Sequence, residues 1–280
     1  MTGRVAIVVE GGAMRGVFTA GVLDAFLERR FDPFDLALGV SAGACNLASH
    51  LAGQHGRNRR SYLELMTRRE FIDPWRALRG RSALDLDWLW DALAEREPLD
   101  VQALARRTTE FLVVATSRAT GKAVYLRPGP AEMFDALKAS SAMPILYRGD
   151  VTVGGERLVD GGVSDPIPVE EAFRRGARDI LVLRTRPADA VKRYDLSARA
   201  TAWQLRREPG LAAAVRELAG NYQRAVAFME RPPPGCRVLQ VAPPVPLATK
   251  RTTRDRRVVE RDYELGRAIG EKAMAGFPGP

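Results

Sequence analysis

The sequence is poor in several residue types on which common folds and catalytic centres depend. Its two cysteines, Cys45 and Cys236, lie far apart and lack the spacing of a metal site, which favours a reducing compartment over a disulfide scaffold. No run approaches the roughly 18 apolar residues that a transmembrane helix needs. The first residues lead directly into the apolar run Val5–Val9, without the basic and cleavage regions of a signal peptide. We therefore expect a cytoplasmic protein.

Lysine is also scarce, although the chain as a whole is basic. Lys and Arg total 43 against 34 Asp and Glu, a net charge of +9, and only five of the basic residues are lysines. A basic surface attracts anions such as phospholipid headgroups or nucleic acid, but a general preference for arginine would give the same composition. The basic stretch Lys250–Arg257 accompanies no nucleic-acid-binding motif. We expect this stretch to be a solvated face and expect no specific nucleic-acid partner.

What the chain does contain is an alternation of strand-like and helix-like segments. Apolar runs at 4–9 and 35–40 predict buried parallel strands, and each is followed by a turn and a helical pattern. These two successive strand–turn–helix units predict a doubly wound α/β sheet. With 280 residues, 46% hydrophobic residues and no linker-like stretch, we expect one domain over residues 1–280, mainly helical from about 197 onward. Further strand-like runs occur at 111–115, 123–126, 158–160, 179–183 and 238–241.

The strongest chemical signal is the pentapeptide Gly39-Val-Ser-Ala-Gly43. Its serine falls where a strand ends and a helix begins, a sharp turn that needs small neighbours and presents the hydroxyl outward. The helix N-terminus behind the serine favours negative charge. Ser41 is therefore the candidate nucleophile, the alternative being a serine that only caps the helix.

Histidine, the most common base for a serine nucleophile, is almost absent. The chain has two, His50 and His55, and both follow Ser41 on or after the same predicted helix. Nine residues separate His50 from Ser41, which places it about 13 Å along the helix axis and on the opposite face. A Ser-His-Asp triad is therefore disfavoured, and the base must be a carboxylate, a lysine or absent.

Asp160 is the best carboxylate candidate. It ends an apolar strand and precedes Gly161 and Gly162, which allow a sharp turn and a close approach to another segment. In a doubly wound sheet the carboxyl ends of the strands meet at one crevice, which would bring Asp160 toward Ser41. An aspartate hydrogen-bonded to a serine orients it and accepts its proton during attack. An ordinary Asp-Gly turn is the alternative.

A glycine-rich turn, Gly11–Gly16, joins the first strand to the first helix. Its backbone N–H groups and the helix N-terminus are suited to hold a phosphate or the oxyanion of a tetrahedral intermediate. The dinucleotide-binding pattern G-x-G-x-x-G is not met, because position 13 is alanine. A dinucleotide site is therefore disfavoured, and the turn is expected to hold either a phosphate or an oxyanion.

Together these motifs resemble those of the patatin-like phospholipase family, in its bacterial branch. The chain has the glycine-rich loop at Glu10–Gly16, G-x-S-x-G at Gly39–Gly43 and D-G-[GA] at Asp160–Gly162, with the stretch Ala139–Pro144 before the last. The resemblance covers about residues 4–187. It implies a three-layer α/β/α sandwich with a mostly parallel central sheet, and hydrolysis of lipid acyl esters through an acyl-enzyme, with no metal and no cofactor. The residues it implies are the catalytic dyad Ser41 and Asp160, the oxyanion donors Gly11, Gly12 and Ala13, and the supporting motif residues Arg15, Gly16, Gly39, Gly43, Gly161 and Gly162.

Two positions depart from the family pattern. Ala13 replaces the more usual glycine and would be strained if the turn needs a positive φ, and Glu10 replaces the commoner aspartate at what we expect to be a structural position. Neither departure removes a catalytic group. Two other function classes stay open beside the lipid ester hydrolase: a thioesterase or acyltransferase with the same elbow, and a non-catalytic basic binding protein on this scaffold.

Aromatic residues concentrate in the segment 71–93, which holds Trp75, Trp88 and Trp90 of the four tryptophans. We hypothesise that this segment caps the crevice and either lines an acyl-chain pocket or touches a membrane surface. Ordinary helix packing is the alternative. The expected partners are therefore a lipid ester substrate and, peripherally, the anionic inner face of a membrane, whereas an oligomeric state does not follow from the sequence.

Overall fold

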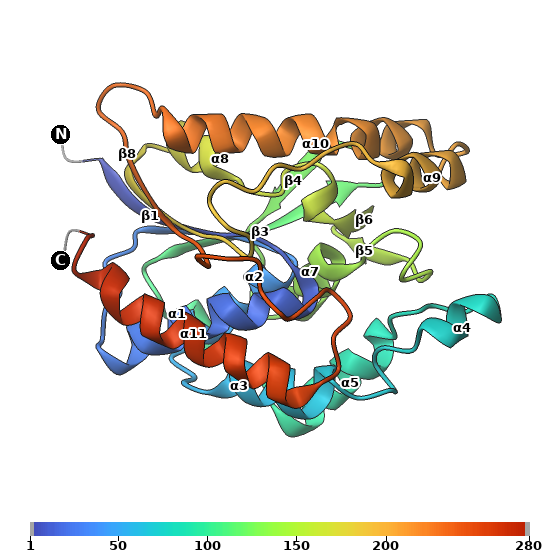
Figure 1. Cartoon of the computed structure of the whole chain (residues 1–280), viewed down its shortest axis with the longest axis horizontal. Coiled ribbons are helices and arrows are strands. Elements are labelled where there is room, and N and C mark those ends of the chain that lie inside the picture. Colours follow the sequence, from blue (N-terminus) through green and yellow to red (C-terminus); the bar gives the residue numbers. More distant parts are fainter. Residues whose placement is uncertain (1–2, 278–280) are drawn as a thin grey trace.

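Eight strands form one mixed sheet in the computed structural model, which describes residues 3–277 (Figure 1). The strand order is β5-β6-β3-β2-β1-β7-β8, and β4 also pairs with β3. Strands β1, β2, β3, β7 and β8 run parallel, whereas β4 and β6 are antiparallel to β3, and β5 is antiparallel to β6. The strands are β1 (Arg4–Val9), β2 (Leu36–Val40), β3 (Glu110–Ser117), β4 (Ala123–Leu126), β5 (Val151–Val153), β6 (Glu156–Asp160), β7 (Ala177–Leu183) and β8 (Arg237–Val241).

Helices cover both faces of this sheet. Figure 1 shows α8 and α10 on one face, and α1, α2 and α11 on the other. The α-helices are α1 (Val17–Glu28), α2 (Ala42–Leu51), α3 (Arg57–Arg60), α4 (Pro74–Leu78), α5 (Leu86–Arg96), α6 (Val101–Ala105), α7 (Met133–Ser141), α8 (Val169–Arg174), α9 (Leu196–Gln204), α10 (Pro209–Glu230) and α11 (Arg256–Met274). Three single turns are η1 (Ala13–Gly16) and η3 (Gly161–Val163), both 3-10, and the π-helical η2 (Ser61–Met66).

The alternation of side chains along the central strand divides the core into two layers. In β1, Ile7 and Val9 pack toward α1 and α2, whereas Ala6 and Val8 pack with residues of α8 and α10. All four are fully buried. A strand covered on both faces must be apolar at every position, because successive side chains point to opposite faces. The predicted three-layer α/β/α sandwich is therefore confirmed.

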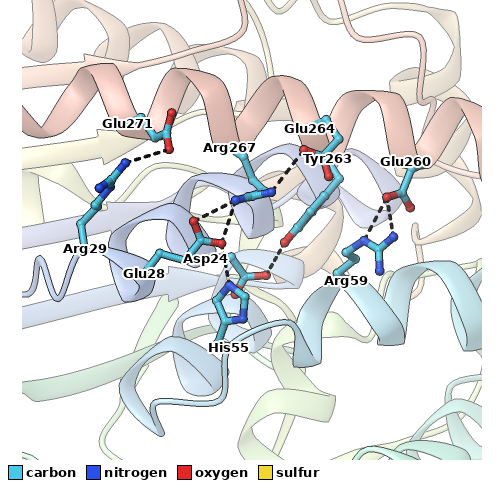
Figure 2. Close-up of polar contacts among 10 residues, drawn as sticks. All are labelled: Asp24, Glu28, Arg29, His55, Arg59, Glu260, Tyr263, Glu264, Arg267 and Glu271. Atoms are coloured by element: carbon cyan, nitrogen blue, oxygen red, sulfur yellow. Dashed lines mark hydrogen bonds and ion pairs between the residues drawn. The ribbon is translucent and has the colours of Figure 1, made fainter.

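The C-terminal part of the chain contacts the N-terminal part on both layers. Strand β8 extends the sheet by pairing with β7. Helix α11 lies along α1, and a Cβ added to Gly266 would lie 2.0 Å from the carbonyl oxygen of Phe18, so the two helices touch backbone to backbone. Polar contacts flank this seam (Figure 2): Tyr263 donates a hydrogen bond of 2.7 Å to the buried Asp24. No helix within residues 3–277 combines the length and apolar composition that crossing a membrane requires.

Candidate active site

Ser41 occupies a strained turn between β2 and α2. Its backbone has φ 54° and ψ −127°, outside the regions that a non-glycine residue normally adopts. Two buried hydrogen bonds stabilise this strained conformation. The Ser41 N–H donates to Ser140 Oγ at 2.7 Å, and Ser140 Oγ donates to the carbonyl of Val114 at 2.6 Å. Ser140, fully buried on α7, therefore positions the elbow. Sequence reasoning missed this role, although Ser140 lies in the stretch 139–144 that formed part of the resemblance.

The small residues of the motifs are required by close backbone contacts. A Cβ at Gly39 would lie 2.4 Å from Ala44 Cα, and one at Gly43 would lie 2.4 Å from the carbonyl of Val9. Real Cβ atoms do not approach so closely, so only glycine permits the strand and helix to meet at the elbow. The same holds for Gly161, where the Cβ would lie 2.2 Å from the carbonyl of Val114, whereas at Gly16 the Cβ would meet a side chain, the Tyr62 hydroxyl at 2.3 Å.

The register of three neighbouring strands brings Asp160 to Ser41. Val40, next to Ser41, pairs with Val114 of β3, and Ala115, the next residue of β3, pairs with Asp160 at the end of β6. The sequence predicts Asp160 near Ser41 from the edge that the carboxyl ends of neighbouring parallel strands share. Strand β6 is antiparallel to β3, and Asp160 reaches the crevice because the sheet ladder places its last residue beside the end of β2.

The Asp160 carboxyl is poised to exchange a proton near neutral pH. The residue is 5% exposed, and burial raises its pKa to about 6. The nearby Ser41 hydroxyl, the hydrogen bond of 2.7 Å from the Gly162 N–H and the positive charges of Arg251 and Lys192 lower the pKa of Asp160 and so act in the opposite direction. A carboxylate with a raised pKa accepts a proton more readily than an ordinary one.

The glycine-rich turn lies directly against the elbow. A Cβ at Gly11 would lie 2.9 Å from the carbonyl of Val40, and a Cβ at Gly12 would lie 2.8 Å from Thr185 Oγ1. The backbone N–H groups of Gly11, Gly12 and Ala13 have no hydrogen-bond acceptor within residues 3–277, so they are free to donate to a bound oxyanion.

Two neighbours fix the shape of this turn. Glu10, buried as a structural position, accepts a hydrogen bond of 2.7 Å from the Thr185 N–H, and Thr185 Oγ1 donates to the Gly11 carbonyl at 3.1 Å. Ala13 has φ 50°, so the strain that the sequence indicated is present.

Both histidines lie away from Ser41. His50 is buried beside α1, with Nδ1 3.3 Å from the Leu23 carbonyl, and burial lowers its pKa to about 4. His55 Nε2 is 2.9 Å from the Glu28 carboxylate on the outer surface. Neither imidazole lines a cavity that contains Ser41, as the helical spacing predicted.

Ser41 stands where two cavities of different character meet. The larger, about 680 Å³, is also lined by Asp160, the glycine-rich turn and basic side chains. The smaller, about 70 Å³, is mainly apolar. Ala13, Ser41 and Met143 line both. The walls of the smaller cavity include Tyr62, Met66, Phe71, Leu84, Leu86, Leu89, Trp90 and Leu93.

The aromatic segment 71–93 thus supplies one wall of the apolar cavity. Trp88 and Trp90 are partly buried and pack against the core, Trp90 edge-to-face on Phe134. Trp75 differs, because it is 65% exposed. The segment therefore packs as core and also lines a cavity beside the nucleophile.

Basic side chains from three distant segments surround the larger cavity. Arg15 comes from the glycine-rich turn, Arg186 and Lys192 from the loop after β7, and Arg251 from the loop between β8 and α11. Arg251 is exposed, as expected for the solvated stretch 250–257, and it also lines the larger cavity. Its loop lies over the site, where the Met14 N–H donates to the Arg251 carbonyl at 3.5 Å.

Comparison with known proteins gives relatives over most of the chain. An uncharacterised Escherichia coli protein, YjjU, is 38% identical over 278 residues, which cover 98% of this chain and 78% of that protein. An uncharacterised NTE family protein of Mycobacterium bovis is 30% identical over 169 residues, 59% of this chain and 44% of the relative. The crystal structure of VipD from Legionella pneumophila matches with a TM-score of 0.50 and 13% identity, over 99% of this chain and 67% of that one, and so shares the fold.

Family models divide the chain into two matched regions. A domain of unknown function, DUF6363, matches residues 208–277, which include α10, β8 and α11. The model described as patatin-like phospholipase matches residues 7–173, more than half of the chain, and spans the elbow, the glycine-rich turn and Asp160. The chain therefore belongs to the patatin-like phospholipase family.

Proposed function

We propose that this protein is a serine acyl hydrolase that cleaves the carboxylic ester bonds of phospholipids or lysophospholipids through a Ser41–Asp160 dyad. Membership of the patatin-like phospholipase family supports a lipid hydrolase at the level of the family. The observation that carries the finer proposal is the junction at Ser41. There a hydroxyl and a buried carboxyl line the same cavity as free backbone donors, and the hydroxyl also borders an apolar cavity.

In the first half of the reaction, Ser41 Oγ attacks the carbonyl carbon of the ester while its proton passes to the Asp160 carboxylate. The carbonyl oxygen becomes an oxyanion, which the N–H groups of Gly11, Gly12 and Ala13 stabilise together with the N-terminus of α2. The carbon–oxygen bond to the alcohol then breaks. Asp160 returns the proton to the departing alcohol oxygen, which leaves an acyl-enzyme.

In the second half, water takes the place of the alcohol. Asp160 accepts a proton from the water as its oxygen attacks the acyl carbon, and the same N–H groups hold the new oxyanion. The bond to Ser41 Oγ breaks and the proton passes to that oxygen, which restores the free serine and releases the fatty acid. In each half, the proton that Asp160 accepts neutralises its carboxylate, and the oxyanion is the one new negative charge.

The two cavities favour an amphiphilic substrate. The first carbons of the acyl chain would lie in the apolar cavity beside Ser41, where burying apolar surface is favourable by roughly 25 cal/mol per Å². The polar remainder of the substrate then lies in the larger cavity, which is lined by charged side chains. This division follows from Ser41 standing at the junction and supports a lipid rather than a small polar ester.

A labelling experiment and a substrate panel test the proposal. A fluorophosphonate probe is expected to label the wild-type protein and Ser197→Ala, which removes another serine of the same cavity, but not Ser41→Ala. Purified wild-type protein should hydrolyse p-nitrophenyl esters and lysophospholipids above the Ser41→Ala blank. Absence of both labelling and hydrolysis would favour the non-catalytic binding protein.

A thioesterase or acyltransferase uses the same elbow, and acyl-thioesters in the panel separate these activities from ester hydrolysis. Faster turnover of thioesters than of oxygen esters would replace the proposal. We also propose that the protein contacts anionic membranes peripherally through Trp75, an exposed aromatic side chain of the segment 71–93. Co-sedimentation with anionic liposomes should then decrease in Trp75→Ala.

A further inference from the structure

The larger cavity beside Ser41 has an excess of positive charge that the protein itself does not neutralise. Five basic side chains and three acidic ones line it, and none of the five basic side chains forms a salt bridge within residues 3–277. The five are Arg15, Arg186, Lys192, Arg193 and Arg251. An unpaired cluster of cations is costly, because each charge repels the others and loses part of its hydration.

The three carboxylates of the cavity are already engaged elsewhere. Glu10 accepts from the Thr185 N–H, Asp160 from the Gly162 N–H, and Asp195 from the Ala198 N–H at the start of α9. Their remaining attraction does not cancel the repulsion among the cations. Burial, followed by the neighbouring charges of Arg186 and Arg251, lowers the pKa of Arg15 to about 10, and the buried Arg15 Nε has no hydrogen-bond partner among the described residues 3–277.

Lys192 and Arg251 share this environment. Burial and then the charges of Arg251 and Arg186 lower the pKa of Lys192 to about 8. Arg251 lies at the rim, and although part of its side chain is exposed, the surrounding protein and Arg186 lower its pKa too. Every one of these groups would be stabilised by an anion placed between them.

An aromatic ring from α10 orders two of the cations. The Tyr222 ring, almost fully buried, lies 5.9 Å from the guanidinium of Arg186 and 5.6 Å from Nζ of Lys192. The Tyr222 hydroxyl accepts a hydrogen bond of 2.9 Å from Arg184, which is itself fully buried. Cations over an aromatic face are attracted to it, so the ring holds them at the cavity with their charges unneutralised.

We propose that Arg15, Arg186, Lys192 and Arg251 form a phosphate subsite for the leaving group of the substrate, completed by the C-terminal region of unknown function. That region, residues 208–277, supplies Arg251 and the Tyr222 platform, and its helix α10 adds Val215, Leu218 and Ala219 to the wall. The inference rests on the proposed hydrolase function, which places the acyl chain toward the apolar cavity and therefore the leaving group in the larger one. It gives the C-terminal region a role in choosing the substrate.

Phosphate is the anion that fits this cluster best. It offers several acceptor oxygens and up to two negative charges, and guanidinium groups bind it through paired hydrogen bonds. Two kinds of acyl donor carry phosphate on the leaving group: a lysophospholipid or phospholipid headgroup, and the phosphates of an acyl-CoA thioester. The shared chemistry is the phosphate, and the substrate arms of the test separate the two sources.

The test compares two variants of the cluster with a charge-matched control. Arg186→Gln and Arg251→Gln remove one cation each, and Arg256→Gln removes an exposed arginine five positions further along that lines neither cavity. The measured quantity is the ratio of kcat/KM for lysophosphatidic acid to kcat/KM for the uncharged ester p-nitrophenyl butyrate. We expect the ratio to fall at least tenfold in each cluster variant and to stay unchanged in Arg256→Gln. An unchanged ratio in folded Arg186→Gln and Arg251→Gln would overturn the subsite, and acyl-CoA in the same panel tells which phosphate source the cluster prefers.

Binding without turnover separates this inference from the proposed function. In the Ser41→Ala background, calorimetric titration with glycerol 1-phosphate should give a dissociation constant that increases at least tenfold on adding Arg251→Gln. Phosphate binding in a protein that cleaves no ester would refute the hydrolase and keep the subsite. Ester hydrolysis with no phosphate binding and no preference for phosphate-bearing esters would refute the subsite and keep the hydrolase.

Discussion

Two buried aspartates, Asp160 and Asp24, have similar surroundings but serve different ends. Each is nearly inaccessible to solvent, has a hydroxyl group close by, accepts a hydrogen bond from a backbone N–H and has a pKa raised mainly by burial. Asp160 faces a cavity of about 680 Å³ beside Ser41. Asp24 is sealed between α1 and α11, where it accepts from Tyr263 at 2.7 Å and from the Gly56 N–H at 3.2 Å. The two carboxylates therefore differ in their access to open space and to the Ser41 hydroxyl, and this difference underlies the catalytic role proposed for Asp160.

Replacing Asp160 should cause the largest loss of activity while increasing the stability of the protein. Asp160→Asn removes the proton acceptor, so kcat on p-nitrophenyl butyrate should fall by about 10³-fold or more. The unfolding free energy at pH 7 should rise by about 1–3 kcal/mol, because a charge is no longer buried. Steady-state kinetics and denaturant unfolding of the same preparation check both. Near-normal turnover would show that Asp160 is not the base.

A substitution at the contact between α1 and α11 should instead lower the stability of the protein. A Cβ at Gly266 would lie 2.0 Å from the Phe18 carbonyl, so Gly266→Ala should separate the two helices and lower the unfolding free energy by about 2–4 kcal/mol. Gly220→Ala is the matched control, since its Cβ would meet only the end of the Arg224 side chain at 3.9 Å. It should stabilise α10 by about 0.5–1 kcal/mol. Equal effects of the two changes would contradict close helix contact.

Removing Asp24 tests the structural carboxylate directly. Asp24→Ala leaves the Tyr263 hydroxyl and the Gly56 N–H without their acceptor, which should cost about 1–3 kcal/mol of unfolding free energy. Asp24→Asn keeps an acceptor oxygen and should cost less. Chemical denaturation measures both, while kcat of the folded fraction should stay within about twofold of wild type. A thousandfold loss of kcat in Asp24→Asn would erase the distinction between the two aspartates.

The pH dependence should report Asp160 through both activity and stability. Since the pKa of Asp160 is about 6, kcat/KM should fall as the pH drops through that value and the base becomes protonated. The folded pKa lies above the unfolded one, so the associated stability is present at low pH and is lost as the pH rises from about 4 to 6.

The contribution of His50 to stability changes with pH in the opposite direction over much of this range. Its pKa is lowered to about 4 in the folded state, so its contribution is lost as the pH falls. Subtracting the stability profile of Asp160→Asn from that of the wild type isolates Asp160. A difference that does not change between pH 4 and pH 7 would contradict the raised pKa.

The smallest effect is expected at the strained turn. Ala13 has φ 50°, a conformation that costs an alanine about 1–2 kcal/mol, whereas glycine adopts it freely. Glycine also makes the unfolded chain more flexible, which takes back about 0.4–1 kcal/mol. Ala13→Gly should therefore stabilise the protein by about 0 to 1.6 kcal/mol, measured by thermal unfolding. Destabilisation would mean that the Ala13 methyl group makes contacts worth more than the strain.

The local elements and the chemistry of the site could be predicted from the sequence because their causes are local. Buried strands must be apolar, which identified 4–9 and 35–40, and a serine elbow needs small neighbours, which identified Ser41. Because histidine is scarce, a carboxylate was the best candidate for the base, and the structure does bring Asp160 to Ser41. The catalytic roles themselves, and one domain over residues 1–280, stay predictions. The pairing of β8 with β7 and the packing of α11 on α1 support one domain.

Other features depend on pairings between distant segments. The antiparallel direction of β6, the support of Ser41 by Ser140 and the approach of Arg251 to the glycine-rich turn join residues from about 40 to 240 positions apart. No local pattern encodes such partners, because a serine or an arginine in a loop has the same local chemistry wherever the loop lies.

The sequence by itself determined which groups could react: a serine in a small-residue elbow, an aspartate before two glycines, and a turn with free N–H groups. Only the tertiary structure decided which groups meet, that Asp160 opens onto a cavity while Asp24 is sealed, and that Arg251 stands near the nucleophile. The physical reason is that reactivity is a property of a side chain, whereas burial, charge repulsion and access are properties of everything packed around it.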